Sequence, residues 1–318
     1  MIYLSVIIPT RNRAKLLDTT LESIIKQTLS QNYFEVIVCD NNSTDNTKMI
    51  CDKYTTSFLN FRYIKTVAPG LHVGRNKGFQ EAKGEVLVYA DDDIVAFPEW
   101  LATIYNCFKN DDSIVLVGGK NIPNWETPPP DWVLEMWKPN KNNERIIAYY
   151  SVLDFGDEIQ QISAQYVWGC NFSVRKRIIE LNKGFHPDGV PQEMIEYRGD
   201  GETAISNYID DNKLKTLYHP KASVLHFVPQ SRMTINYLKK WAFNNTISKL
   251  YTDTRSGNIE VRGSMLSVYL HYFKLLFYNH NNAAKIYLAR EKAFRFYQKQ
   301  LEKNPKLKEW VLKEHYLE

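Results

Sequence analysis

The N-terminal part of the chain alternates largely apolar segments of strand length with a segment of helical periodicity, and this alternation restricts the possible folds more than any other feature. Residues 4–8 and 34–39 are the apolar segments. Between them, Leu17, Leu21 and Ile24 recur at intervals of three or four residues, which is typical of a helix with one buried face. Strands without a polar face are typical of parallel sheets that helices cover on both sides. The pattern therefore predicts a βαβ unit in an open α/β sheet.

The next segment extends this sheet. Residues 61–67 have the composition of a strand, residues 73–82 have that of a helix closed by Gly84, and residues 85–90 form another apolar run. We therefore expect two further strands and one further helix within the first hundred residues.

Polar side chains follow three of the predicted strands. They occupy residues 9–13, 40–45 and 91–93. In open α/β sheets, ligands bind beyond the carboxyl ends of the strands, because loops and helix N-termini converge there. The sequence therefore predicts a polar binding site at one edge of the sheet.

Three consecutive carboxylates, Asp91, Asp92 and Asp93, point to a divalent cation. Adjacent carboxylates repel one another unless they are solvated or share a cation, and hard oxygen ligands favour Mg²⁺ or Mn²⁺. In an extended segment alternate residues point the same way, so Asp91 and Asp93 can reach one ion while Asp92 faces elsewhere. A solvated acidic turn is the alternative interpretation.

Asp40 and Arg75 are candidate nucleotide contacts. Asp40 directly follows an apolar run, where a carboxylate needs hydrogen bonds, and a nucleobase N–H group is one possible donor. Capping of its own turn is the other. The chain contains neither GxGxxG nor GxxxxGK[ST], which argues against dinucleotide and P-loop sites, although Arg75 could face a diphosphate.

Taken in order, four segments resemble the family 2 glycosyltransferases, an inverting group with the GT-A fold. They are residues 6–12, 36–47, 75–84 and 87–93. The resemblance implies an α/β fold with a Rossmann-like, mostly parallel central sheet flanked by helices, followed here by a C-terminal helical extension.

The resemblance also implies roles for individual residues. Asp91 and Asp93 match the family's DxD pair, which holds Mn²⁺ or Mg²⁺ on the donor's diphosphate, and His226 matches a histidine that can complete that metal site. The implied contacts of the nucleoside diphosphate sugar are Pro9, Thr10, Arg11, Asn12, Asp40, Asn41, Arg75, Asp91 and Asp92.

Glu202 is the candidate catalytic base, which an inverting transfer needs to deprotonate the attacking hydroxyl. It occupies the base position when the helix beginning near Ile205 is aligned with the family's acidic motif. Gly201 replaces the first acidic residue of that motif and Asp200 lies two positions upstream of Glu202, so Asp200 remains a rival. Both could instead be carboxylates that favour the start of a helix.

The chain divides into three predicted regions. Residues 1–100 would bind the nucleotide sugar, residues 101–230 would hold the acceptor and the base, and residues 231–318 would form a basic, aromatic-rich helical region. That last region has 16 Lys and Arg against 7 Asp and Glu, a net charge of +9, whereas the rest carries −5.

Trp125 and Trp132 are among the flat aromatic side chains that could stack on sugar rings or simply fill the core.

Composition restricts the binding partners and the cellular location that we expect. A formal net charge of +4 is not a nucleic-acid signature, and four cysteines without CxxC spacing indicate neither a zinc site nor a disulfide framework. The N-terminus lacks the pattern of a signal peptide, so we expect a cytoplasmic protein. The basic region and the apolar run at residues 265–278 raise the further possibility of peripheral contact with an anionic membrane, at the inner face of the plasma membrane.

The expected function is metal-dependent transfer of a sugar from a nucleoside diphosphate donor, UDP-linked by preference. The acceptor would be a hydroxyl of a glycan or lipid-linked saccharide, in polysaccharide or surface-glycan synthesis. Two alternatives remain: a catalytically silent nucleotide- or glycan-binding protein of the same fold, and a nucleotidyltransferase resembling the sugar-nucleotide pyrophosphorylases. The latter usually carry a Gly-rich basic loop after the first strand, which residues 9–12 do not match.

Overall fold

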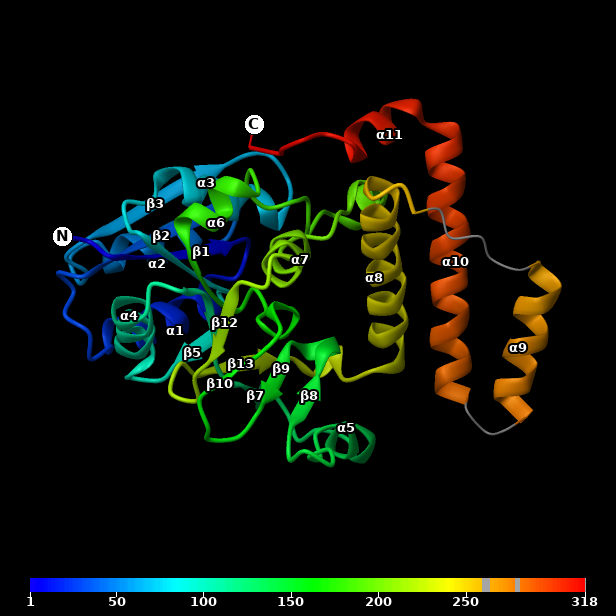
Figure 1. Ribbon diagram of the computed structural model, residues 1–318, viewed down its shortest axis with the longest axis horizontal. Helices are drawn as coiled ribbons and strands as arrows, with labels where there is room; N and C mark the ends of the chain where they lie inside the picture. The colour runs from blue at the N-terminus through cyan, green and yellow to red at the C-terminus, as the bar shows by residue number, and fades with distance from the viewer. Residues whose placement is uncertain (259–263, 278–280, 318) are drawn as a thin grey trace.

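A computed structural model describes residues 1–258, 264–277 and 281–317 and contains two β-sheets (Figure 1). The larger sheet has eight strands in the order β10-β12-β6-β11-β4-β1-β2-β3. Its strands are β1 (Leu4–Thr10), β2 (Phe34–Asn41), β3 (Phe61–Thr66), β4 (Val86–Ala90), β6 (Ile114–Gly118), β10 (Gln160–Gln161), β11 (Asn171–Arg175) and β12 (Lys215–Tyr218). The smaller sheet has the order β5-β13-β7-β9-β8. Its strands are β5 (Ile94–Ala96), β7 (Asn121–Trp125), β8 (Arg145–Ile147), β9 (Val152–Asp154) and β13 (Val224–Val228).

The N-terminal half of the large sheet is parallel, as the sequence predicts. β1 pairs with β2 along its whole length, with Leu4 opposite Phe34 at one end and Thr10 opposite Asp40 at the other. On its other side β1 pairs with β4. β11 runs antiparallel to both β4 and β6. The parallel register brings the carboxyl ends of β1, β2 and β4 to one edge, so the polar segments that follow them are neighbours. The predicted strands and the mostly parallel α/β fold are confirmed.

Helices cover both faces of this sheet. They are α1 (Ala14–Ile25), α2 (Thr47–Tyr54), α3 (Leu71–Glu81), α4 (Trp100–Asn110), α6 (Lys176–Leu181) and α7 (Thr203–Asp211). Helix α5 (Asp131–Met136) packs beside the smaller sheet instead, where its Val133 shares a core with Ile147 of β8. Alternate residues of β1 separate two cores: Val6 packs with Leu21 of α1 and with Trp100 of α4, whereas Ile7 shares a core with Phe79 of α3. Strands that are apolar throughout are therefore explained by burial on both faces.

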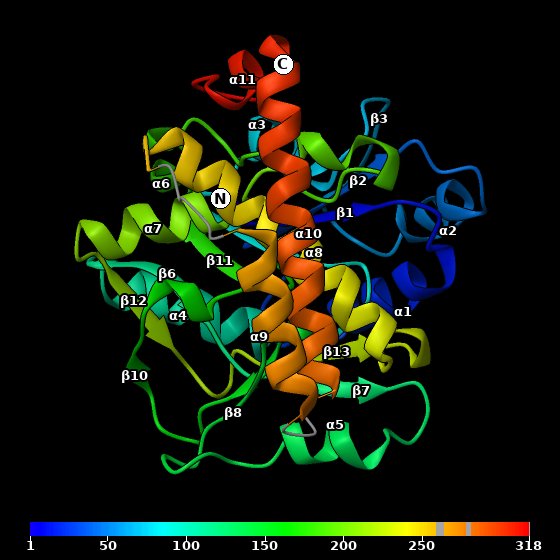
Figure 2. The same cartoon turned by 90° about the vertical axis from the view of Figure 1, so that its right-hand side faces the viewer.

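The C-terminal helices form a layer beside this body (Figures 1 and 2). They are α8 (Ile235–Arg255), α9 (Met265–Phe277), α10 (Asn281–Lys303) and α11 (Pro305–Val311). α10 packs between α8 and α9, and buried aromatic side chains of α8 and α10, such as Tyr251 and Phe294, share a core with α11. Among the described residues, no helix combines the length and the apolar character needed to cross a membrane.

Short 3₁₀ turns complete the connections. They are η1 (Ala148–Tyr150), η2 (Ala164–Tyr166), η3 (Gln192–Tyr197) and η4 (Gln230–Arg232). The loop between α6 and α7 is fixed to α3 by Asn76, whose Oδ1 accepts from the amide of Phe185 at 2.7 Å and whose Nδ2 donates to the carbonyl of Phe185 at 3.0 Å. Nδ2 also lies 3.2 Å from the carbonyl of Tyr316, so one buried amide holds the C-terminal segment as well.

Asn76→Ala should destabilise the fold, because it leaves the buried amide and carbonyl of Phe185 without their partner. We expect the free energy of unfolding to fall by about 1–3 kcal/mol, measured by urea denaturation. Asn106→Ala, on the exposed side of α4, is the matched control and should have little effect. Equal stability of Asn76→Ala and the wild type would contradict this account of the loop.

Candidate functional site

A cleft with a volume of about 360 Å³ opens beyond the carboxyl ends of β1, β2 and β4. Eight of the residues selected from the sequence line it: Pro9, Thr10, Arg11, Asn41, Asp91, Asp92, Asp93 and His226. The cleft also takes side chains from outside the N-terminal part, including Tyr149 and, from α8, Tyr237 and Trp241. The C-terminal region thus contributes to the cleft, while the predicted division at residues 100 and 230 stays a prediction.

The three consecutive aspartates point in different directions. Asp92 is buried and turns toward the loop after β1, where its Oδ2 accepts from the hydroxyl of Thr10 at 2.7 Å. Arg13 bridges two of the carboxylates, with Nη1 at 2.5 Å from Asp92 Oδ1 and Nη2 at 2.9 Å from Asp93 Oδ2. Asp91 keeps 29% of its side chain exposed and lies on the other side of the turn, near Arg75. The hydroxyl of Thr10, a candidate nucleotide contact, therefore donates its hydrogen bond to Asp92 and fixes that side chain.

His226 reaches the aspartates because β5, which directly follows them, pairs with β13. Ile94 lies opposite His226 in this pairing, and the amide of Phe227 donates to the carbonyl of Asp93. The His226 Nε2 atom lies 3.4 Å from Asp93 Oδ1. The histidine comes from more than a hundred residues away, yet the second sheet places it beside the acidic turn.

The hydrogen bonds of His226 show that its second ring nitrogen is available to a proton or a cation. Nδ1 lies 2.8 Å from the carbonyl oxygen of Tyr150, and a carbonyl can only accept, so Nδ1 carries a proton. Nε2 then faces Asp93 Oδ1, a buried oxygen without a hydrogen-bond partner at ordinary geometry. With Nδ1 protonated, a lone pair of Nε2 points at a lone pair of Asp93 Oδ1. A proton or a cation between these two atoms would remove their repulsion.

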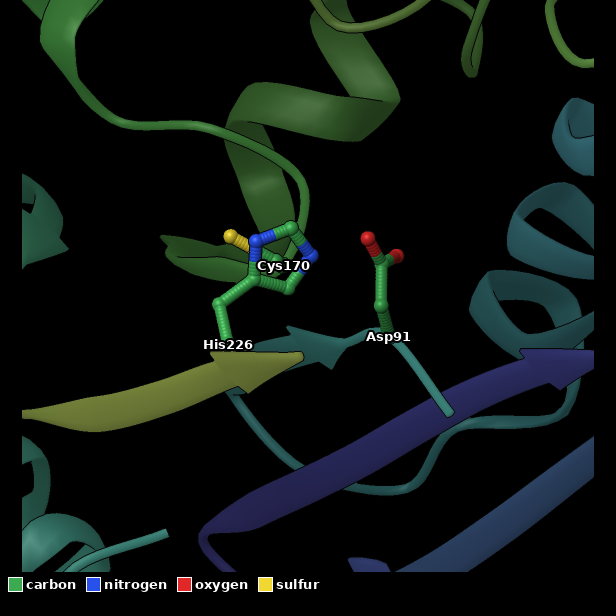
Figure 3. Close-up of side chains that lie close together, drawn as sticks. All are labelled: Asp91, Cys170 and His226. Carbon is green, nitrogen blue, oxygen red and sulfur yellow. The ribbon is translucent and has the colours of Figure 1, made fainter. Parts of the chain in front are cut away.

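Donor atoms suited to a metal ion gather at this point. Ligand atoms of Asp91, Cys170 and His226 lie within 4.8 Å of one another, and Figure 3 shows Asp91, from the turn after β4, and His226, from β13, extending toward the same space. Burial raises the pKa of the Cys170 thiol well above its ordinary range, so this sulfur stays protonated and is a poor partner for a hard ion. Carboxylate oxygens and an imidazole fit Mn²⁺ or Mg²⁺ better.

The pKa values of the three carboxyl groups differ because their surroundings differ. Enclosure in the protein raises the pKa of Asp91, against the opposing charge of Arg75. Burial likewise raises the pKa of Asp92 to about 7, although Arg13 opposes the shift. Burial also acts to raise the pKa of Asp93, but the contact with His226 and the charge of Arg13 outweigh it and hold the pKa below its usual range. Asp93 is therefore ionised at neutral pH, and a cation would favour ionisation of the other two.

Arg75 connects the acidic turn with the candidate base. Its side chain is buried, and its guanidinium lies 2.8 Å from Glu202 Oε2 through Nη1 and 3.7 Å from Asp91 Oδ1 through Nη2. The guanidinium also lies over the ring of Phe185, 5.5 Å from its centre. Gly169 leaves room for it, since a Cβ at that position would lie 1.8 Å from Nη2. Arg75 is thus directed at two carboxylates and is not among the residues lining the cleft.

The two candidate bases have different environments. Glu202 keeps 22% of its side chain exposed, with Oε1 accepting from the amide of Gly169 at 3.1 Å and Oε2 accepting from Arg75. Asp200 is buried, with Oδ1 at 2.7 Å from His186 Nδ1 and Oδ2 accepting from Thr252 at 2.6 Å. Both oxygens of Asp200 are therefore engaged, Oδ1 within the α6–α7 loop and Oδ2 with α8, whereas Glu202 contacts Arg75, which also reaches Asp91.

Two other selected residues hold loops together. The Oδ1 atom of Asn12 accepts a hydrogen bond from the backbone amide of Thr44 at 2.7 Å, and the backbone amide of Asn12 donates to the hydroxyl of Ser43. These two bonds join the loops after β1 and β2. Asp40 is buried, with Oδ1 accepting from the amide of Ser43 and Oδ2 accepting from the hydroxyl of Tyr63 at 2.6 Å. Neither residue is among those lining the cleft, and both fix the backbone of the segments that border it.

Sequence reasoning missed several residues of the site. Arg13 was visible in the polar segment after the first strand, and its position next to the aspartates depends on pairing across the sheet. Arg232 lies 3.9 Å from Asp93, and the rings of Tyr149 and Trp241 meet edge to face at 4.7 Å on the cleft wall. No local motif marks these three. Of the tryptophans considered for sugar stacking, Trp125 and Trp132 pack against the core formed around Tyr150 and Met233.

Comparison with known proteins identifies the family. The sequence profile described as "Glycosyl transferase family 2" matches residues 5–181. The glycosyltransferase AglE of Haloferax volcanii is 33% identical over 100 residues, which make up 31% of this chain and 33% of that protein. TarP of Staphylococcus aureus, a poly(ribitol-phosphate) beta-N-acetylglucosaminyltransferase, is 30% identical over 128 residues, which make up 37% of this chain and 39% of that protein. The matched segments thus span little more than a third of these relatives.

Solved structures share the fold over nearly the whole chain. The mannosyltransferase PcManGT of Pyrobaculum calidifontis, in complex with GDP-mannose and Mn²⁺, is similar with a TM-score of 0.56 and 16% identity, covering 95% of this chain and 75% of that one. TarS of S. aureus, residues 1–349 in complex with UDP-GlcNAc, is similar with a TM-score of 0.52 and 16% identity, covering 94% and 92%. These similarities confirm the GT-A architecture. Since the family profile matches more than half of its length, the chain belongs to glycosyl transferase family 2.

Proposed function

We propose that the chain is a metal-dependent, inverting glycosyltransferase that moves a sugar from a nucleoside diphosphate, UDP-linked by preference, to a hydroxyl of a glycan or lipid-linked acceptor. One observation carries the proposal: Arg75 contacts both Glu202 and Asp91, so the candidate base lies next to a candidate metal ligand that lines the cleft. The TarS complex with UDP-GlcNAc supports a UDP-linked donor.

Asp91, Asp93 and His226 are the residues that would hold the divalent ion. A bound Mn²⁺ or Mg²⁺ would stabilise the negative charge that develops on the departing diphosphate. Asp92 has a different task, because its bonds to Thr10 and Arg13 fix the turn from which Asp91 and Asp93 project. Arg13 and Arg232 add positive charge at the cleft, where a diphosphate would lie.

Glu202 would take the proton from the attacking hydroxyl. Each of its oxygens accepts one hydrogen bond from the protein and retains a further lone pair, and part of the side chain is exposed. Arg75 and the amide of Gly169 hold the carboxylate in one orientation, so the proton acceptor is prepositioned before the acceptor binds. Arg75 would therefore act by positioning Glu202 and Asp91 rather than by direct contact with the diphosphate.

The remaining selected residues would shape the nucleotide site. Pro9, Arg11 and Asn41 line the cleft and are the proposed contacts of the nucleoside. Asn12 and Asp40 would support it by fixing the loops after β1 and β2.

The acceptor would bind on the aromatic side of the cleft. Tyr149, Tyr237 and Trp241 line this side, and aromatic faces stack on the apolar faces of sugar rings. The name of TarP gives poly(ribitol-phosphate) as its acceptor, and for this chain we propose a surface glycan or a related polymer. A lipid-linked acceptor would place the enzyme at a membrane surface, which agrees with the proposed peripheral contact of the C-terminal region.

Glu202→Gln should abolish sugar transfer while donor binding persists. Removal of a general base lowers turnover by about 100-fold or more, and glutamine preserves the size of the side chain. The measurement is Mn²⁺-dependent release of UDP from UDP-sugars with and without acceptor, next to donor affinity from calorimetry. Asp200→Asn is the comparison variant, and we expect it to lose stability but keep turnover within a few-fold. Near-normal transfer by Glu202→Gln would assign the role to Asp200.

Arg75→Lys should lower kcat far more than it changes donor affinity. Lysine keeps the charge but lacks the planar fork that reaches Glu202 and Asp91 together. Turnover and donor KM are the readouts, and Arg177→Lys, at an exposed position of α6, is the control. A rise in donor KM with unchanged kcat would instead indicate that Arg75 binds the diphosphate.

Asp91→Asn should remove the effect of Mn²⁺ on nucleotide binding. A ligand present at 100 times its dissociation constant stabilises the native state by about 2.7 kcal/mol, so Mn²⁺ with UDP should raise the melting temperature of the wild type. The Mn²⁺-dependent part of that rise should disappear in Asp91→Asn and persist in Glu99→Gln, an exposed control. Identical Mn²⁺ responses in Asp91→Asn and the wild type would refute the metal assignment.

A further inference from the structure

Helix α9 exposes an apolar face on the outside of the C-terminal layer. α10 separates α9 from α8 and from the catalytic body, so α9 is the outermost of the three helices (Figures 1 and 2). Its exposed side chains include Leu266 (70% exposed), Tyr269 (47%), Leu270 (63%) and Phe273 (61%). Their spacing of three and four residues places them on one side of the helix. We call these four residues the α9 outer face.

The outer face is not needed for packing within the chain. Val268 is buried and Leu275 is half-buried on the opposite side of α9, toward α10. His271 adds a ring contact to Tyr287 of α10, with centres 4.6 Å apart. A helix that is apolar on both sides and covered on only one has an unused hydrophobic surface, and such surfaces commonly mark sites of interaction with a partner or membrane.

We propose that the α9 outer face binds the surface of a bilayer that contains anionic lipids. Charge supports this choice: residues 231–318 carry a net charge of +9, whereas residues 1–230 carry −5. An anionic surface therefore attracts the C-terminal layer and repels the catalytic body, which orients the molecule with α9 toward the lipid. Lys274 is exposed next to the outer face, where it can meet lipid headgroups.

The length of α9 favours a helix lying in the interface. Its 13 residues span about 20 Å at 1.5 Å per residue, which is too short to cross the roughly 30 Å hydrocarbon core. A helix of this length that exposes apolar side chains on one side lies parallel to the membrane, with those side chains at the boundary between headgroups and acyl chains.

A second copy of the chain is a less favourable occupant. A symmetric dimer through α9 would bring two regions of charge +9 against each other, and that repulsion opposes association. An anionic bilayer instead supplies the opposite charge. This inference deepens the proposed peripheral contact by naming the surface that makes it, and it does not rest on the transfer reaction.

The order of the C-terminal helices would connect the membrane surface to the cleft. α8 contributes Tyr237 and Trp241 to the cleft and packs on α10, which in turn packs on α9. Docking of α9 would therefore hold the aromatic side of the cleft in a fixed orientation relative to the bilayer.

The test is co-sedimentation of the full chain with vesicles of phosphatidylcholine alone and of phosphatidylcholine with phosphatidylglycerol, at low and high salt. We expect binding to the anionic vesicles, weakened by salt. The double substitution Leu270→Glu and Phe273→Glu should weaken it at least about tenfold, since it removes two apolar side chains from the interface and adds like charge. Leu59→Glu with Leu181→Glu, two exposed leucines of the catalytic body (65% and 61% exposed), is the matched control and should bind like the wild type.

Three outcomes would overturn the inference. They are absence of binding to anionic vesicles, binding that the α9 substitutions leave unchanged, and self-association in ultracentrifugation that the α9 substitutions abolish without any vesicle binding. UDP release from UDP-sugars in vesicle-free buffer should be equal in the wild type and the α9 variant. That measurement separates a failure of membrane docking from a failure of the proposed transfer reaction.

Discussion

The buried guanidinium of Arg75 is the contact on which the geometry of the site depends. A buried cation is costly unless carboxylates compensate it, and here Glu202 and Asp91 do so from two different segments of the chain. Because Arg75 belongs to α3, which packs on β1 and β2, the position of both carboxylates is tied to the central sheet. Gly169 permits the arrangement because a larger residue would occupy the space of the guanidinium.

The aspartate run shows how one short segment can serve two purposes. Asp92 is turned inward and fixed by Thr10 and Arg13, which anchors the loop. Asp91 and Asp93 are turned toward the cleft and toward His226, on the strand that pairs with β5. Repulsion among three carboxylates is thus reduced by arginines on one side, and we propose that a divalent ion reduces it on the other. A site of this kind needs both sheets, since the first carries the aspartates and the second carries the histidine.

Local sequence pattern was enough to predict the parallel sheet, because strands buried on both faces have an unmistakable composition. The polar rim followed from the rule that parallel strands end at the same edge. The aspartate run indicated Asp91 and Asp93, and the family resemblance added His226; the structure places all three around one cleft. It could not show that Arg75 is directed at Glu202, since those residues are 127 positions apart and only tertiary packing brings them together. Arg232 and Trp241 were not predicted for the same reason. Neither belongs to a motif, and both reach the cleft from the C-terminal region.

The central claim is that Asp91 and Asp93 hold a divalent ion against the diphosphate of the donor. A crystal structure of the protein with UDP and Mn²⁺, with anomalous scattering recorded for manganese, tests it most directly. We expect an anomalous peak bonded to Asp91, Asp93 and the diphosphate oxygens, with the uracil near the loops that follow β1 and β2. A nucleotide bound without manganese at these carboxylates, or manganese bound elsewhere, would contradict the account.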